Sequence, residues 1–374
     1  MSHSAEEAHA VTTTQIRSST MIRHRREVLE VERYRPGSSG RIRPPVALAS
    51  NESPYELPSA VRTAVICAMG QGNRYPDFEK THLTQALADH HGVTPEQVSI
   101  DNGSSSLLRH LISACAQQDH IVVYPWPSFP SYEHATLFAG ATPVRVPLDE
   151  HWRPDLDAIA AQVDNRTRAV FLCLPNNPTG TTVSHEALIT FLEQIPPEVL
   201  VVIDECYHDY VTDPSAAQGL ALVPHFPNIV VLKSFSKSYG LAGLRVGYAL
   251  SSVAIAELIR AMIVPFAVST LAQAAAAACL EPQVQTVIGE RIAATVAERE
   301  RVRRRLITQE ITVVPSHTNF LYLPAQSDAP TRVHAFEARG IAIRAIGSDA
   351  LRVSIGTATE NDLFLNEIGL LKHS

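Results

Sequence analysis

Short apolar runs rich in β-branched residues alternate with helical patterns between about residues 98 and 250, and this alternation constrains the fold more than any other feature. Helices are predicted at 104–117, 130–139, 155–163 and 184–194. The predicted strands are VSI, HIVVY, TPVRV, RAVFLCL, EVLVVID, NIVVLKS and RVGYAL. Near-continuous apolar strands separated by helices indicate a mainly parallel sheet of seven strands, covered by helices on both faces.

The pattern changes after residue 265. A long helical tract is predicted at about 269–309, and its charged run ERERVRRRL is interpreted as a solvated helix face. The segments ITVVPSHTNFLYL, IAIRAI and LRVSIG, with helices at 330–338 and 359–372, indicate a small α+β unit. We therefore expect an α/β fold in three parts: an N-terminal arm (1–45), a large domain (46–265) whose first segment contributes to the small domain, and a linking helix with a smaller C-terminal α+β domain (266–374).

Composition narrows the classes of function. A net charge of −7 over 374 residues argues against nucleic-acid binding, which usually needs a basic domain. No segment reaches about 18 uninterrupted apolar residues, so no membrane span is expected. The 5 cysteines lack a C-x-x-C pair and the N-terminus lacks an apolar signal core, which favours a reducing, cytoplasmic location. The 16 histidines show no H-E-x-x-H spacing, so no metal site is expected.

Four motifs lie just after predicted strands or at a helix start, where open α/β sheets bind ligands. The first, LPNNPTG, follows RAVFLC and fits a plain turn as well as a binding loop. The second places Asp204 after an apolar strand, where a carboxylate needs a cationic or protonated partner. Asp204 could instead cap a following helix, and both interpretations stay open.

The third motif, SFSKSYGLAGLR, places Lys237 beside Ser234 and Ser236, with Arg245 eight positions further on. This pattern is typical of an anion cradle next to a nucleophilic amine, although a structural loop lysine is the simpler alternative. The fourth, DNGSSSLLRHL, opens a predicted helix whose free N–H groups could face an anion. Its serines could equally be helix caps.

One ligand explains all four motifs together: a phosphorylated aldehyde with a basic ring nitrogen, which is pyridoxal 5′-phosphate. Lys237 would form the Schiff base and Asp204 would pair with the protonated ring nitrogen. The residues expected to hold the phosphate are Ser104, Ser105, Ser234, Ser236 and Arg245.

These stretches resemble the fold-type I aminotransferases, and within them the histidinol-phosphate aminotransferase branch. The similarity runs from about Tyr34 to the C-terminus through NESPY, RYPD, NGSSS, PNNPTG, DECY, SFSKSYGLAGLRVGY, VPFAVST, AERERV, HTNFLYL and LRVSIGT. It implies the pyridoxal-phosphate transferase fold of type I, an amino acid and a 2-oxo acid as substrates, and a homodimer with sites at the subunit interface.

The resemblance also implies roles for single residues. Lys237, Asp204 and Tyr207 would be catalytic, and Asn177 would join Tyr207 in binding the phenolic oxygen of the cofactor. Phe129, in PSF where the family usually has PTY, would stack on the cofactor ring. Tyr75 would reach the phosphate in the neighbouring subunit. The residues expected at the substrate are Arg352, which would grip the α-carboxylate, with Asn177, and Arg344 and Tyr34 near the distal end.

Departures from the family pattern leave the substrate open. Ser105 and Ser106 replace acidic residues, and NESPYELP lacks the glycine of the usual motif. We therefore expect an aminotransferase for an L-amino acid with a histidinol-phosphate-like, aromatic or other specialised side chain. A decarboxylase, cyclase or oxidase of the same fold is the alternative. A transcription regulator would need a DNA-binding domain, for which about 45 polar residues are too few.

Overall fold

The computed structural model describes residues 45–371, and its centre is a seven-stranded sheet in the order β2-β8-β7-β6-β5-β3-β4. All seven predicted strands form. Their bounds are β2 (Val98–Asp101), β3 (Ile121–Trp126), β4 (Thr142–Pro147), β5 (Thr167–Cys173), β6 (Leu200–Asp204), β7 (Ile229–Ser234) and β8 (Gly247–Ser251). The predicted α/β class is confirmed.

The direction of the strands brings the predicted motifs to one edge of the sheet. The five neighbours β7, β6, β5, β3 and β4 are parallel, whereas β8 is antiparallel to both β7 and β2. The sheet is therefore mixed, with one reversed strand. Asp204 ends β6 and Ser234 ends the adjacent parallel strand β7, so both lie at the same edge.

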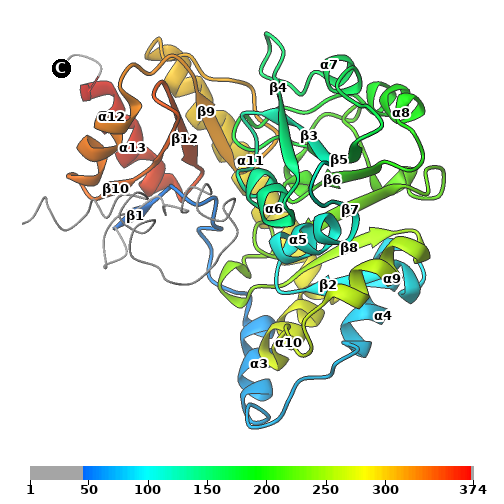
Figure 1. The fold of residues 1–374 in the computed structure, drawn as a ribbon. Helices are drawn as coiled ribbons and strands as arrows, with labels where there is room; N and C mark the ends of the chain where they lie inside the picture. Colours follow the sequence, from blue (N-terminus) through cyan, green and yellow to red (C-terminus); the bar gives the residue numbers. More distant parts are fainter. Residues whose placement is uncertain (1–44, 372–374) are drawn as a thin grey trace, which may run out of the picture.

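Helices cover both faces of the sheet, as predicted from its uninterrupted apolar strands. Alternate strand residues pack on two separate clusters: Phe171 and Val202 face one, and Leu172 and Ile203 face the other. The helices are α5 (Ser104–Cys115), α6 (Ser131–Ala139) and α9 (Val253–Met262) on the first face, and α7 (Leu156–Ala160) and α8 (His185–Gln194) on the second (Figure 1).

A further group of helices packs on strands β2 and β8, on the same face of the sheet as α7 and α8. It contains α3 (Ser59–Met69), α4 (Thr81–His91) and the alanine-rich α10 (Thr270–Cys279). The predicted tract at 269–309 is two helices, because Pro282 starts the long helix α11 (Pro282–Thr308) at a position that favours proline. None of the helices within residues 45–371 is both long and apolar enough to cross a membrane.

The interpretation of ERERVRRRL as a solvated face is wrong for one residue. Arg299 on α11 is only 1% exposed, and it donates hydrogen bonds to the carbonyl oxygens of Tyr210 (3.2 Å) and Thr318 (2.9 Å). Both carbonyls belong to buried residues, and buried backbone acceptors need a donor. Arg304 and Arg305 in the same run are exposed, as expected.

The C-terminal part forms a smaller unit beside the large sheet. Its three-stranded sheet has the order β11 (Arg344–Ile346), β12 (Ala350–Ser354) and β9 (Phe320–Leu323), with α12 (Ala329–Glu337) and α13 (Ala358–Leu371). The short β1 (Val46–Ala47, blue) pairs in parallel with β10 (Ile341–Ala342), so the first described strand joins the C-terminal unit (Figure 1). The domain boundary near residue 265 stays a prediction.

Candidate active site

Lys237 lies two residues beyond the buried Phe235, on the loop that follows β7. Its Nζ donates to the carbonyl oxygen of Ser50 (3.3 Å) and lies 5.6 Å from the centre of the Tyr207 ring. Desolvation by burial, together with the positive charge of Arg352, lowers the pKa of Lys237 to about 8. About a tenth of this amine is therefore neutral, and so nucleophilic, at pH 7, far more than for an ordinary lysine.

A second lysine four positions earlier has the opposite environment. Lys233 lies 3.0 Å from a carboxylate oxygen of Glu205, and the other oxygen of Glu205 accepts from the N–H of Gly219 (2.6 Å). Although burial favours the neutral amine, the Glu205 carboxylate raises the pKa of Lys233. Lys233 is thereby held as an ammonium ion, so Lys237 is the reactive lysine of the two.

Asp204 is 4% exposed and accepts two hydrogen bonds. Its Oδ2 accepts from the hydroxyl of Tyr132 (3.0 Å) and its Oδ1 from the backbone N–H of Cys206 (3.2 Å). Burial raises the pKa of Asp204, and these two donors act in the opposite direction. The interpretation of Asp204 as a helix cap is wrong, because the next helical turn, His208–Tyr210, has Tyr207 at its N-cap.

Three segments meet where an anion is expected. Arg245 donates to Oγ of Ser236 (3.3 Å), and Oγ of Ser234 accepts from the N–H of Ser236 (3.0 Å). Gly103, at φ +83°, precedes α5, and a Cβ built on it would lie only 2.6 Å from Nη2 of Arg245. The start of α5 and the Arg245 guanidinium therefore lie in direct contact, which only a residue without a side chain allows at position 103.

The serines at this helix start are not caps. The N-cap of α5 is Gly103, and no side chain makes a cap hydrogen bond there. Ser104 and Ser105 stand half-buried in the first turn, and Oγ of Ser104 accepts from the thiol of Cys206 (3.3 Å). The first turn of α5 thus has no side-chain cap, which leaves N–H groups available to an anion.

The aromatic residues predicted at the ring lie at the same edge of the sheet. Phe129 is half-buried beside α6, with its ring edge-on to that of Tyr132 at 5.7 Å. Tyr207 is 5% exposed, and its hydroxyl accepts from Nδ2 of Asn51 (3.0 Å). The ring of Tyr207 packs edge-to-face on Phe320 of β9 at 5.1 Å, so the N-terminal segment and the small sheet both hold it in place.

Arg352 on β12 joins the small unit to the site. Its guanidinium donates to Oδ1 of Asn177 (2.6 Å) and to the carbonyl oxygen of Ala49 (2.7 Å), and lies 5.4 Å from the centre of the Phe320 ring. Asn177 belongs to the loop after β5, whose Gly180 carbonyl accepts from the N–H of His317 (2.7 Å). A cation fit to bind a carboxylate is thus fixed beside the reactive lysine.

The remaining three predicted residues differ in position: one lies opposite Arg352, one is exposed, and one is outside the described residues. Arg344 is half-buried on β11, directly opposite Arg352 in the antiparallel pair, so the two side chains share a face. Tyr75 is 81% exposed and stacks on Phe266 at 4.6 Å. Tyr34 lies outside the described residues.

Sequence reasoning missed two polar residues of the site, Tyr132 and Asn51. Both sit in stretches that the sequence analysis used: Asn51 begins NESPY, and Tyr132 lies three residues after Phe129. Asn51 also receives a bond from Nδ2 of Asn319 on its carbonyl oxygen (3.1 Å). No local pattern identifies their partners: the partner of Asn51 is 156 positions away, and that of Tyr132 is 72 positions away.

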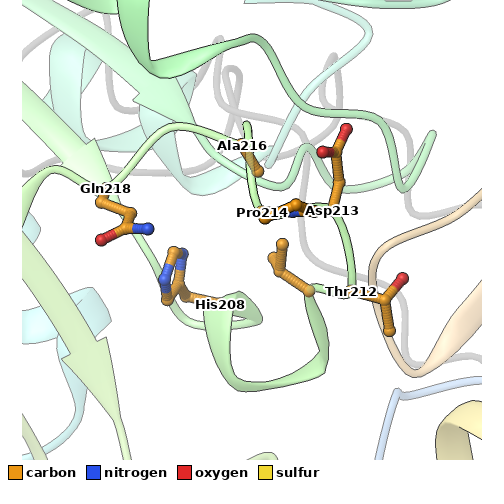
Figure 2. A pocket seen from close by; sticks show the side chains of 7 residues that line it. His208, Thr212, Asp213, Pro214, Ala216 and Gln218 are labelled. Atoms are coloured by element: carbon orange, nitrogen blue, oxygen red, sulfur yellow. The ribbon is translucent and has the colours of Figure 1, made fainter.

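A separate pocket of about 240 Å³ follows Tyr207 along the chain. Figure 2 shows the ring of His208 facing the side chain of Gln218, with the carboxylate of Asp213 turned away from both. None of the predicted site residues lines this pocket. Within residues 45–371 there is also no group of three or more His, Cys, Asp or Glu placed to hold a metal ion.

Together these residues fit the predicted cofactor. An arginine beside a helix start, a buried carboxylate and a lysine of lowered pKa are brought to one edge of the sheet from segments far apart in sequence. Each feature suits one part of pyridoxal 5′-phosphate: the phosphate, the ring nitrogen and the aldehyde.

Comparisons with known proteins agree with this arrangement. A profile of the family described as aminotransferase class I and II matches residues 43–368. An aromatic amino acid aminotransferase of Thermobifida fusca is 45% identical over 89% of this chain and 92% of its own length, and one of Rhodococcus opacus is 42% identical over 92% and 94%. A crystal structure of histidinol-phosphate aminotransferase from Sinorhizobium meliloti in complex with pyridoxal-5′-phosphate superposes with a TM-score of 0.85 at 27% identity, covering 93% of this chain and 97% of that one.

Proposed function

This chain belongs to the class I and II aminotransferases, and on that premise we propose that its amino donor is an aromatic L-amino acid and its acceptor a 2-oxo acid. It is a transaminase, and its cofactor is pyridoxal 5′-phosphate. The observation that supports an aromatic donor is the similarity to enzymes named for that substrate, at 45% and 42% identity. The histidinol-phosphate enzyme of similar fold shares only 27%.

The proposed roles follow from the charges at the site. The bound cofactor supplies an electron-withdrawing ring that acidifies the substrate's α-proton. Nζ of Lys237 accepts that proton, and the lowered pKa of Lys237 suits an amine that must be neutral to do so. Asp204 holds the proton on the ring nitrogen. Arg352 binds the α-carboxylate with two parallel hydrogen bonds, and so orients the α-carbon toward Lys237.

The remaining residues position the cofactor. Tyr207 and Asn177 donate to its phenolic oxygen, and Phe129 packs on the face of its ring. The phosphate is held by the start of α5 and by the residues Ser104, Ser105, Ser234, Ser236 and Arg245. Arg344 shares a face with Arg352, so its proposed role is to bind the distal end of an anionic 2-oxo acid acceptor.

We also propose a homodimer in which Tyr75 donates to the phosphate in the other subunit. Its exposed ring stacks on Phe266, which also contacts Phe78, and a monomer would leave much of these three rings in water. Mixing Tyr75→Phe subunits with Lys237→Ala subunits should produce hybrid dimers. In each hybrid, one of the two sites contains both Lys237 and Tyr75, so activity should recover. Activity that never recovers on mixing, or a monomer in sedimentation, contradicts the shared site.

The donor is tested by a panel of amino acids with 2-oxoglutarate as acceptor. We expect the highest kcat/KM with phenylalanine, tyrosine or tryptophan, and oxo acid formed in equal amount to the amino acid consumed. A higher kcat/KM with histidinol phosphate overturns the aromatic proposal while leaving transamination intact. Release of carbon dioxide without oxo acid would mean that Arg352 does not keep the carboxylate out of the reaction.

A further inference from the structure

The carboxylate predicted to face the ring nitrogen has a donor that no sequence motif indicated. The hydroxyl of Tyr132 lies 3.0 Å from Oδ2 of Asp204, and both residues are buried, Tyr132 completely. We infer that Tyr132 is a positioning residue of the reaction: its hydroxyl favours the ionised form of the Asp204 carboxylate and fixes the orientation that the ring nitrogen requires. This inference rests on the cofactor, and not on the aromatic substrate.

The ring of Tyr132 is held from three sides, so its hydroxyl has little freedom to turn away. It stacks on Phe171 of β5 with the ring centres 4.7 Å apart and the planes 17° apart. Tyr124 and Phe129 pack against its edges at 6.1 Å and 5.7 Å. Its backbone carbonyl accepts from the hydroxyl of Thr136 (2.7 Å), which fixes the first turn of α6. The donor is therefore pre-organised before any ligand binds.

A donor is needed at this position because burial alone favours the protonated carboxyl. Desolvation raises the pKa of Asp204, whereas the hydrogen bonds from Cys206 and Tyr132 lower it. The Glu205 carboxylate next along the chain adds to the raising effect. The backbone N–H of Cys206 serves Oδ1, and Tyr132 serves Oδ2. Without the hydroxyl, one oxygen of a buried anion loses a charge-assisted bond.

Burial also raises the pKa of Tyr132 well above its usual range, and the nearby Asp204 adds to the effect. The phenol therefore stays protonated at every pH at which the protein works, and it can act only as a donor toward the carboxylate. The same turn of α6 follows Phe129, which is proposed to cover the cofactor ring. One short segment thus supplies both Phe129, which is proposed to cover the cofactor ring, and Tyr132, which binds the carboxylate at the ring nitrogen.

The test compares how tightly the cofactor-free protein binds two ligands. One is pyridoxal 5′-phosphate, and the other is an analogue with carbon in place of the ring nitrogen. Tyr132→Phe keeps the packed ring and removes only the hydroxyl, so we expect the melting temperature of the cofactor-free protein to stay within a few degrees of the wild type. The matched control is Tyr124→Phe, from the same cluster. Burial raises the pKa of the Tyr124 hydroxyl, the Glu133 carboxylate adds to the effect, and Arg145 opposes it.

We expect Tyr132→Phe to weaken the binding of pyridoxal 5′-phosphate about ten- to a hundredfold, and the binding of the analogue less than about threefold. In an Asp204→Asn background, Tyr132→Phe should change neither affinity. The resonance of a ¹⁵N-labelled ring nitrogen should move in Tyr132→Phe and stay in place in Tyr124→Phe.

Equal weakening for both ligands overturns the inference, because the hydroxyl then acts on the fold and not on the ring nitrogen. Unchanged binding of both ligands also overturns it. A protein that binds neither ligand in its wild-type form contradicts the cofactor assignment itself, so the two failures are distinguishable.

Discussion

The guanidinium of Arg352 donates a hydrogen bond to Oδ1 of Asn177 over 2.6 Å, and this bond ties the small sheet to the loop after β5. A second bond from Arg352 reaches the carbonyl oxygen of Ala49 (2.7 Å) in the N-terminal segment. Three distant parts of the chain therefore converge on one planar cation. That cation is in place before a substrate arrives, which reduces the ordering cost of binding a carboxylate.

The first prediction concerns Arg352→Lys, which keeps the charge and loses the fork of donors. An ammonium cannot bind a carboxylate bidentately. We expect the KM for the amino acid to rise about ten- to a hundredfold, while the affinity for pyridoxal 5′-phosphate changes less than about threefold. Steady-state kinetics and cofactor titration measure the two quantities. A larger loss of cofactor affinity than of substrate affinity would place Arg352 at the cofactor instead.

The second prediction concerns pH. Below pH 8 most Lys237 is protonated and cannot attack an aldehyde, because its pKa is lowered only to about 8. The rate at which the cofactor-free protein captures pyridoxal 5′-phosphate should therefore rise about tenfold per pH unit at low pH and level off above about 8. Stopped-flow absorbance follows this rate.

A neighbouring positive charge penalises the ammonium form of Lys237, so removing it should raise the pKa. Arg352→Gln is expected to shift the midpoint of the capture rate to higher pH, because Arg352 is the second cause of the shift after desolvation. Arg304→Gln, on the exposed part of α11, should leave the midpoint unchanged. A midpoint that falls in Arg352→Gln would show that Arg352 does not act on Lys237.

The third prediction concerns the anion cradle. In Gly103→Ala, the new methyl group would lie 2.6 Å from Nη2 of Arg245, on a backbone with φ +83° that side chains rarely adopt. We expect the affinity for pyridoxal 5′-phosphate to fall about tenfold or more, as measured by equilibrium titration. Gly243→Ala is the matched control, because nothing lies within 4 Å of its added carbon and it belongs to the loop of Arg245. Equal affinities in the two variants would show that the contact between Gly103 and Arg245 does not contribute to phosphate binding.

The fourth prediction concerns stability. Arg299→Met keeps much of the side-chain volume but leaves the buried carbonyls of Tyr210 and Thr318 without this donor. Each carbonyl left without a donor is expected to lower the free energy of unfolding by about 1–3 kcal/mol. Arg305→Met, on the exposed face of α11, should change stability by less than about 0.5 kcal/mol. Denaturant unfolding of both variants decides whether Arg299 has a structural role.

Much of the large sheet was predictable because its strands are apolar throughout. Buried parallel strands have no polar face to interrupt the pattern, so VVID and IVVLKS indicate both a strand and the place where it ends. The break before Pro282 was missed, although proline starts a helix better than it continues one. The reversed direction of β8 has no local signal, because an antiparallel strand buried on both faces has the same composition as a parallel one.

The site was predictable where a motif contains its own chemistry and not where partners come from afar. SFSKSYGLAGLR contains the lysine, the serines and the arginine within one stretch. In contrast, Arg299 looks like one charge among many in ERERVRRRL, and only the carbonyls 89 and 19 positions away explain its burial. The bond between Tyr132 and Asp204 crosses 72 positions in the same way.

The most direct measurement locates the covalent bond between cofactor and protein. Two lysines lie four positions apart, one paired with Glu205 and one of lowered pKa. Borohydride makes the bond permanent, and mass spectrometry of the digested protein then identifies the modified residue. The account predicts the reduced pyridoxyl group on Lys237 and an unmodified Lys233, whereas a group on Lys233, or on no lysine, would contradict it.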